Sequence, residues 1–302
     1  SGALLIPCIL SLAIHGLNFG IDFTGGSAWE VQYTEAVDTE NIVSVLANNG
    51  LPNARVQQVG DATEHRYLIR TEEIREGSEQ KTKLTAALGT LGTMIPEGES
   101  LNTVGASVGN SIRNRSVLAV AAASVGILLY IAFAFRNTQR PFLYGIAAIV
   151  AMLHDALIVL GVFSILGWLF NVEVDALFIT ALLTIIGFSV HDTIVVFDRI
   201  RENLINRVAS SFEDVVNYSI AQTLVRSVNT SLTVLITLLA LYLFGGSSTK
   251  NFVLALLIGV VAGTYSSIFN ASQILVSWEN HEIQNAFNRI FRRKQAPTTR
   301  VA

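Results

Sequence analysis

Three charged side chains interrupt long apolar stretches of this sequence. They are Asp155, Asp192 and Arg226, and each acid directly follows a histidine, His154 or His191. A charge at the centre of a bilayer costs at least about 2.5–3.5 kcal/mol, and such residues commonly serve a path for protons or ions. The residue types therefore predict acid–base chemistry inside a membrane.

Asp192 and Arg226 are predicted to lie at matching depths. Counted at 1.5 Å per helical residue from the external ends of their spans, Asp192 is roughly 25 Å deep and Arg226 roughly 27 Å. Antiparallel neighbouring helices would bring the carboxylate against the guanidinium, where each neutralises the other. Protonating the acid would free the arginine and favour another packing, which describes a switch. A static ion pair that holds the two helices together fits the residues equally well.

His154 and His191 titrate near neutral pH and are candidates for passing protons to the acids. Adjacent residues on a helix point about 100° apart, so both members of a His-Asp dipeptide cannot face one water path equally. Packing and hydrogen bonding are the alternative roles for Asp155 and for both histidines. We expect no metal and no cofactor, because the sequence offers no further ligands clustered at that depth.

The composition predicts a membrane protein. Of the 302 residues, 51% are hydrophobic and 14% charged, whereas soluble chains carry about a quarter charged residues. The net charge of −3 gives no indication of a nucleic-acid partner. The single cysteine, Cys8, excludes an intrachain disulfide.

Six stretches are long and apolar enough to cross about 30 Å of hydrocarbon as helices. They are residues 3–19, 116–135, 142–167, 176–197, 228–244 and 251–277. The first lacks the positive start and the cleavage site of a signal peptide, so we interpret it as an anchor. Arginines concentrate after the second and fourth spans and in the tail, which predicts that both termini are cytoplasmic. Arg113 and Arg115 lie on the external side, where the charge rule is weak because the polar region before them is long.

The long polar region predicts one small extracytoplasmic α+β domain within residues 21–115, after a first membrane helix at 1–20. Its pattern is strand, helix, strand, strand, helix, strand, at residues 29–33, 39–48, 55–59, 65–71, 79–91 and 100–108. That order is typical of a ferredoxin-like domain. Residues 116–278 hold the other five membrane helices and an amphipathic cytoplasmic helix near 211–226. Residues 279–302 form a basic cytoplasmic tail.

The segment Gly20-Ile-Asp-Phe-Thr-Gly-Gly26 follows the first span. Its glycines, Gly20, Gly25 and Gly26, favour a tight exit turn, and Asp22 adds an acid. The spacing is wrong for a phosphate-binding loop, and the Gly-Lys-Ser/Thr ending is missing. We therefore interpret these residues as a structural motif.

Three segments together resemble the SecF family of protein-export membrane proteins. They are the 20–26 segment, His-Asp-Thr-Ile-Val-Val-Phe-Asp-Arg-Ile-Arg-Glu-Asn at 191–203, and Leu-Tyr-Leu-Phe-Gly-Gly at 241–246. The resemblance covers essentially the whole chain. It implies that Asp192 is the family's intramembrane acid and Arg226 its partner, while His191 stands where many relatives have Asn.

The resemblance also implies a function and partners. The chain would be a proton-driven, non-enzymatic subunit of Sec protein translocation in the bacterial inner membrane. It would work with SecD, either as a separate chain or fused upstream, with the SecYEG channel and SecA, and on an unfolded preprotein. The large loop would then lie in the periplasm or outside the cell.

Three other functions compete with this interpretation. A small-molecule proton antiporter of the wider resistance-nodulation-division group would be expected to carry a larger external domain with a substrate pocket. An intramembrane aspartyl protease uses Tyr-Asp and Gly-x-Gly-Asp contexts, and neither surrounds Asp155 or Asp192. A purely structural scaffold for SecD remains open.

Overall fold

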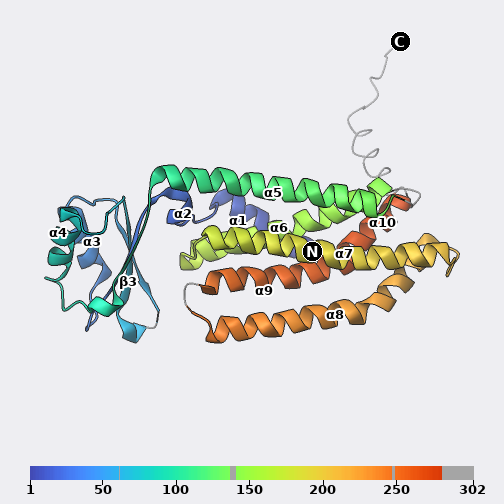
Figure 1. Ribbon diagram of the computed structural model, residues 1–302. Helices are drawn as coiled ribbons and strands as arrows, with labels where there is room; N and C mark the ends of the chain where they lie inside the picture. The colour runs from blue at the N-terminus through green and yellow to red at the C-terminus, as the bar shows by residue number, and fades with distance from the viewer. Residues whose placement is uncertain (61, 137–140, 247–248, 281–302) are drawn as a thin grey trace, which may run out of the picture. The chain divides into compact units, whose positions relative to one another are not determined.

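A computed structural model describes residues 1–60, 62–136, 141–246 and 249–280 (Figure 1). The chain divides into two compact units. The α+β unit contains Leu17–Ala119 and Asn171–Ile179, and the helical unit contains Ser1–Gly16, Val120–Phe170 and the chain from Thr180 onward. Each unit is described separately below.

The α+β unit is built on a four-stranded antiparallel sheet with the order β2-β3-β1-β4. Its strands are β1 (Gly26–Gln32), β2 (Arg55–Val59), β3 (Arg66–Thr71) and β4 (Ser100–Val104). Side chains of a strand alternate between the two faces, and in β1 Ser27, Trp29 and Val31 are buried. Trp29 pairs with Ile69 on one side and Leu101 on the other, so large apolar side chains share one face of the sheet.

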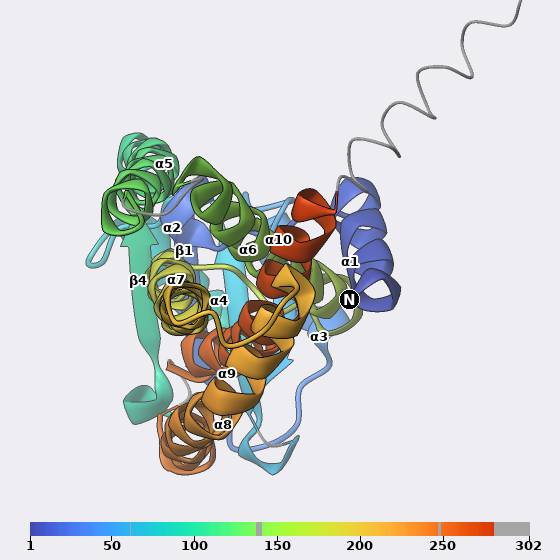
Figure 2. The ribbon, with the colours of Figure 1, turned by 90° about the vertical axis from the view of Figure 1, so that its right-hand side faces the viewer.

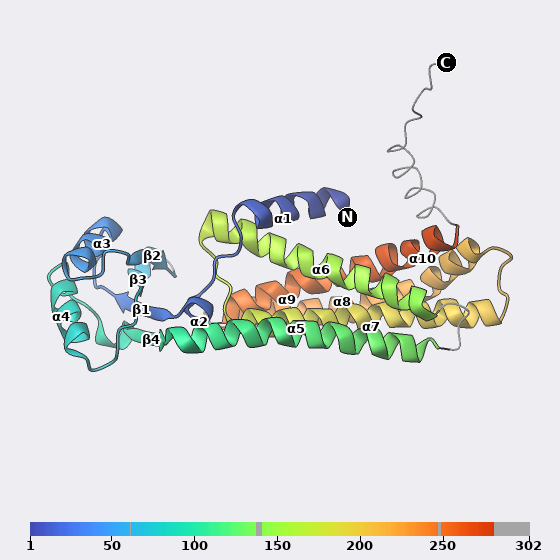
Figure 3. The same ribbon diagram turned by 90° about the horizontal axis from the view of Figure 1, so that it is seen from above.

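Two helices, α3 (Thr39–Asn48) and α4 (Glu79–Leu88), cover that face (Figures 1 and 3). Each begins at a polar cap, because the first backbone N–H groups of a helix need an acceptor. The Asp38 carboxylate accepts from the Glu40 amide at 3.0 Å, and the Ser78 hydroxyl from the Lys81 amide at 3.1 Å. The unit also holds the short helices α2 (Ile21–Thr24), η1 (Ala62–Glu64) and η2 (Pro96–Gly98).

The six main elements of this unit occur in the predicted order, with errors of extent at their ends. Strand β1 begins at Gly26 and not at residue 29, and α4 ends at Leu88 and not at residue 91. The last strand was expected to reach residue 108, but β4 ends at Val104 and helix α5 begins at Ala106. The alternating apolar residues after Gly105 therefore belong to the first turns of a helix. A short apolar run fits a strand and a helix equally well, so periodicity alone does not place this boundary.

The helical unit consists of long apolar helices. They are α5 (Ala106–Ala134), α6 (Pro141–Phe170), α7 (Ala176–Ile205), α8 (Phe212–Phe244) and a last rod made of α9 (Lys250–Tyr265), the π-helix η4 (Ser266–Ala271) and α10 (Ser272–Glu279). The first turns of α5 and α7 belong to the α+β unit. With the last rod counted once, five helices among the described residues are long and apolar enough to cross a membrane.

Two predicted segments differ in the structure. The span expected at 3–19 forms only the 13-residue helix α1 (Gly2–Ile14), after which Gly16 adopts a positive φ of 68°. The amphipathic helix near 211–226 and the span at 228–244 are one continuous helix, α8. Its predicted start is found, with the Ser211 hydroxyl accepting from the Asp214 amide at 3.1 Å. The basic tail from residue 281 lies outside the described residues.

Helix α6 is central to the helical unit, where it packs against α1, α9 and η4 (Figures 2 and 3). Its contact with α1 depends on a missing side chain. A Cβ atom on Gly161 would lie 2.2 Å from the Cβ of Cys8, which is closer than two carbon atoms can approach without displacing one helix.

We expect Gly161→Ala to separate α1 from α6 and to lower the free energy of unfolding by about 1–3 kcal/mol, as overpacking does. Thermal unfolding of the purified chain in detergent measures the change. Gly126→Ala is the matched control, because no atom lies within 4 Å of its added Cβ. Equal melting temperatures for the two variants would contradict this packing.

Candidate functional site

Asp155 of α6 is a buried acid of the helical unit with partners on both carboxylate oxygens. Its side chain is 1% exposed. The Oδ2 atom accepts hydrogen bonds from the Ser189 hydroxyl of α7 at 2.5 Å and from the Ser266 hydroxyl of η4 at 2.6 Å. Its Oδ1 lies 3.0 Å from Nδ1 of His154. Asp155 therefore ties three helices together through one carboxylate.

The π-helix and a glycine bring the serine donors to Asp155. Wide π turns occur mainly as short insertions in α-helices, frequently at functional sites. Here the turn begins at Ser266. Just before it, a Cβ on Gly263 would lie 3.2 Å from the Cβ of Ser189 and 3.7 Å from Oδ2 of Asp155. The absence of a side chain at Gly263 lets the last rod approach α7 closely.

Asp192 lies one turn after Ser189 on α7 and has a different environment. It is 3% exposed, yet among the described residues its Oδ2 has no hydrogen-bond partner. The neighbouring groups that act on it are the charges of His191 and Arg226 and the hydroxyl of Ser227, which lies beside it outside standard hydrogen-bond geometry. The Ser227 hydroxyl is buried and likewise lacks a standard hydrogen bond within the described part of the chain. Asp192 is thus a buried acid with spare bonding capacity.

Arg226 lies within electrostatic range of Asp192, but the expected contact pair is not formed. No ion pair of 4.0 Å or less joins their side chains among the described residues, and Arg226 is exposed. His191 is exposed as well. No hydrogen bond between described residues connects Asp155 directly with Asp192, so the structure places the two acids in separate clusters that share helix α7.

The glycine loop at residues 20–26 lies in the α+β unit and is tightly packed. Gly25 and Gly26 adopt positive φ values of 74° and 113°, which favour glycine. A Cβ on Gly25 would lie 2.8 Å from Cα of Ala106, and one on Gly26 would lie 2.5 Å from the Thr71 carbonyl oxygen. Both residues therefore need glycine for its conformation and for close approach.

The same loop contacts the segment that leads into α7. The Gly20 amide donates to the Val174 carbonyl at 2.9 Å, and the Val174 amide donates to the Asn18 carbonyl at 2.8 Å. The Ala176 amide, the first of α7, donates to Oδ2 of Asp22 at 2.9 Å. The sequence indicates a turn here, but nothing in it predicts that the loop binds residues 174–176, which are about 150 residues away.

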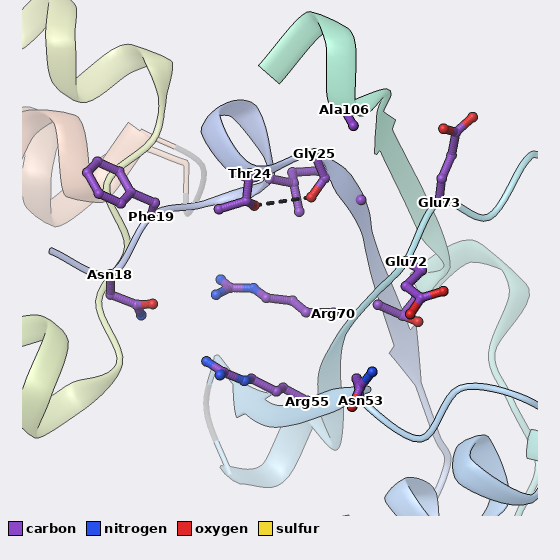
Figure 4. Close-up of a pocket in the computed structure, with 13 residues that line it drawn as sticks. Asn18, Phe19, Thr24, Gly25, Asn53, Arg55, Arg70, Glu72, Glu73 and Ala106 are labelled. Atoms are coloured by element: carbon purple, nitrogen blue, oxygen red, sulfur yellow. Dashed lines mark hydrogen bonds between the residues drawn. The ribbon is translucent and has the colours of Figure 1, made fainter. Parts of the chain in front are cut away.

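A cavity of about 530 Å³ opens beside this loop (Figure 4). Arg55 and Arg70 point into it from β2 and β3, where they are direct cross-strand partners. Burial, and secondarily the charge of Arg55, lower the pKa of Arg70 to about 10. Arg70 also forms an ion pair with Glu173. Within the described ranges, no group of three His, Cys, Asp or Glu side chains is arranged to hold a metal ion.

Two family models match this chain. The model described as "Protein export membrane protein SecD/SecF, C-terminal" matches residues 84–281, which is more than half of the sequence, and the "SecD/SecF GG Motif" model matches residues 10–37. The chain belongs to the SecD/SecF family. The GG-motif match contains Gly20, Asp22, Gly25 and Gly26, and the C-terminal match contains Asp155, Asp192 and Arg226.

Named relatives of this SecD/SecF chain are similar over almost its whole length. A protein translocase subunit SecF of Thermobaculum terrenum is 55% identical over 301 residues, which are 97% of this chain and 93% of the relative. That of Anaerolinea thermophila is 41% identical over 292 residues, with 95% and 92% covered.

A solved structure is also similar. The crystal structure of SecDF, a translocon-associated membrane protein from Thermus thermophilus, matches with a TM-score of 0.78 and 36% identity. The match covers 92% of this chain and 37% of that SecDF chain. The SecD/SecF chain described here therefore spans little more than a third of that longer protein.

Two residues that hold the acid of α6, Ser189 and Ser266, were not identified from the sequence. A hydroxyl in an apolar span was the available signal, because such groups hydrogen-bond across membrane helices. The signal does not reveal which helix supplies the partner. The contact between Asp22 and Ala176 was missed for the same reason.

Replacing the serine donors should destabilise this SecD/SecF chain cooperatively. We expect Ser189→Ala and Ser266→Ala each to cost about 1–3 kcal/mol, the price of one unmade buried hydrogen bond. The double variant should lose more than the sum, because Oδ2 then keeps no hydroxyl donor. Unfolding in detergent measures all three losses. Ser267→Ala is the control, since that hydroxyl donates to the carbonyls of Gly263 and Thr264; additive losses would argue against the cluster.

Asp175 should make stability depend on pH. It accepts from the Phe178 amide at 2.8 Å, while burial, and after it the charge of Asp22, raise its pKa above 3.8. An acid with a raised pKa in the folded state loses stability as the pH rises from its unfolded to its folded pKa. Asp175→Asn keeps an acceptor for Phe178 and removes the charge. The melting temperature of Asp175→Asn minus that of the unmodified chain should therefore increase as the pH rises above about 4. A difference that does not change with pH would contradict the buried charge.

Proposed function

We propose that this chain is an accessory subunit of Sec protein translocation that uses a transmembrane proton gradient to promote preprotein export. The relatives named as protein translocase subunit SecF, at 55% and 41% identity, support the translocation part. A relative named protein translocase subunit SecDF, from Bacillus subtilis, is 35% identical over 290 residues. All three are translocase subunits by name, which supports a role other than catalysis.

The observation that carries the proton part is the environment of Asp192. A carboxylate oxygen buried at this level without a hydrogen bond is costly when ionised, and His191 and, after it, Arg226 offer compensating charge. Taking up a proton removes the cost and the attraction to Arg226 together. The two protonation states of Asp192 therefore favour different packing of α7 against α8. Such a difference is required for converting proton flow into movement.

The exposed surfaces of two helices support a SecD partner. Helices α5 and α8 leave most of their apolar residues exposed, whereas α6, α7 and the last rod bury about half. A second helical unit in the membrane, SecD as a separate or fused chain, would cover them. By the same family relation, the further partners are the SecYEG channel, SecA and an unfolded preprotein.

The proposal includes a membrane topology. The chain lies in the bacterial inner membrane with both termini in the cytoplasm, and α1 is the sixth span beside the five long helices. The α+β unit lies on the external side as a ferredoxin-like domain. Its strand order β2-β3-β1-β4, with every pair antiparallel, supports that assignment.

Asp192→Asn should abolish the gradient-dependent part of preprotein export while the variant still co-purifies with SecD, because an amide cannot cycle a proton. Export into inverted membrane vesicles, with and without an imposed gradient, measures this. Asp198→Asn is the matched control on the same helix, since Asp198 is an exposed acid paired with Arg201. It should leave export unchanged.

The remaining alternatives give different results in that assay. A scaffold for SecD would export normally with both Asp192→Asn and Arg226→Gln. A small-molecule antiporter would show altered drug accumulation and normal preprotein export when the chain is deleted. Either result would displace the proposed function.

A further inference from the structure

The glycine loop meets three different elements inside the α+β unit, and we call this meeting point the joint. It comprises residues 18–26, the segment 171–176 and the first turn of α5. Helix α7, which begins at the joint, continues to Ile205 and carries Asp192. The contacts of the joint therefore decide what the external end of that helix is attached to.

Backbone and side-chain hydrogen bonds attach α7 to the loop. Phe19 and Val174 form a parallel β-bridge, flanked by the two amide–carbonyl bonds of Val174 described above. Asp22 then accepts from the Ala176 amide. The first amides of a helix have no acceptor within the helix, and a carboxylate at that end is also favoured by the helix dipole. Asp22 is the side chain that joins the loop to the helix itself.

Close packing attaches the same loop to α5 and to the sheet. Gly25 lies against Ala106, and a Cβ on Gly109, one turn later in α5, would lie 2.9 Å from the Gly25 amide nitrogen. Gly26 begins β1 and lies against the Thr71 carbonyl of β3. These contacts leave no room for a side chain, so the loop, the first turn of α5 and the sheet behave as one packed body.

An ion pair adds a second attachment to the sheet. Arg70 of β3 pairs with Glu173, which lies three residues before α7 begins at Ala176. Both side chains are mostly buried, with side-chain exposures of 24% and 14%. The segment 171–176 is thus held from one side by residues 18–22 and from the other by β3.

We propose that Asp22 is a positioning residue for Asp192: it fixes the start of α7 to the glycine loop, so that the sheet and the first turns of α5 and α7 stay one body when Asp192, further along α7, changes its protonation state. Asp192 follows Ala176 by 16 residues on one uninterrupted helix, a rise of about 24 Å. A helix of this length transmits displacement along its axis only if its end is anchored. This inference rests on the proposed function, and it assigns the GG motif a role in that function.

Amide exchange in the assembled complex tests the attachment without measuring activity. Asp22→Ala removes the acceptor, so exchange at the first turn of α7 should become about tenfold faster, the effect of losing one such hydrogen bond. Asp22→Asn keeps an oxygen acceptor and should exchange as the unmodified chain does. Asp38→Ala is the control, because Asp38 caps α3 of the same unit and should leave α7 unchanged. Equal exchange in Asp22→Ala and Asp22→Asn would overturn the assignment.

Gradient-dependent export tests the coupling. Asp22→Ala should lose most of the gradient-dependent component while it keeps the export measured without an imposed gradient and its association with SecD. Asp22→Asn should restore the component, and Asp38→Ala should retain it. If Asp192→Asn abolishes this component and Asp22→Ala does not, the joint is not part of the coupling. If Asp192→Asn itself has no effect, the proposed function fails instead.

A reversible cross-link tests whether the joint stays closed during the cycle. Phe19→Cys and Val174→Cys, in a Cys8→Ala background, place two thiols on bridged positions at a spacing that suits a disulfide. Oxidation should leave gradient-dependent export unchanged, because a body that moves as one does not open here. Inhibition on oxidation that a reductant reverses would show that the joint must open, and it would overturn the proposal.

Discussion

The cost of holding a carboxylate where water is scarce governs the helical unit. Two acids meet this cost in different ways. Asp155 receives hydroxyl donors from two other helices and becomes a fixed tie between them. Asp192 keeps one oxygen without a partner and faces Arg226 through space. The first arrangement holds three helices in register, whereas the second leaves a buried carboxylate oxygen without a hydrogen bond.

In the α+β unit the main constraint is steric. Its glycine loop has to pass between a helix start and a sheet edge, and side chains at Gly25 or Gly26 would collide with backbone atoms on either side. The hydrogen bond from Ala176 to Asp22 then extends this packed body to α7. Sterics and a single carboxylate thus connect the sheet and the glycine loop to the start of the helix that carries Asp192.

Much of this architecture can be predicted from the sequence, because apolar length, strand alternation and polar caps are local signals. They located the long spans, five of the six domain elements closely, and the start of α8 at Ser211. The short run after Gly105 was placed in a strand because its pattern fits either structure. Partners distant in sequence could not be predicted: nothing near Asp22 indicates Ala176, and nothing near Asp155 indicates Ser266. Depth counting brought Arg226 near Asp192 but could not specify whether their atoms touch.

The wide turn at Ser266–Ala271 also determines what the surrounding lipid meets. Neighbouring residues of a regular α-helix point about 100° apart, so both are buried only where the helix is packed over a broad face, as Asp192 and Thr193 of α7 are. In the π turn, Ser266 and Ser267 are both fully buried, one bonded to Asp155 and the other to the Gly263 carbonyl. The last rod can therefore carry consecutive hydroxyl groups through its middle and still present hydrocarbon side chains, such as Phe269, on its outer surface.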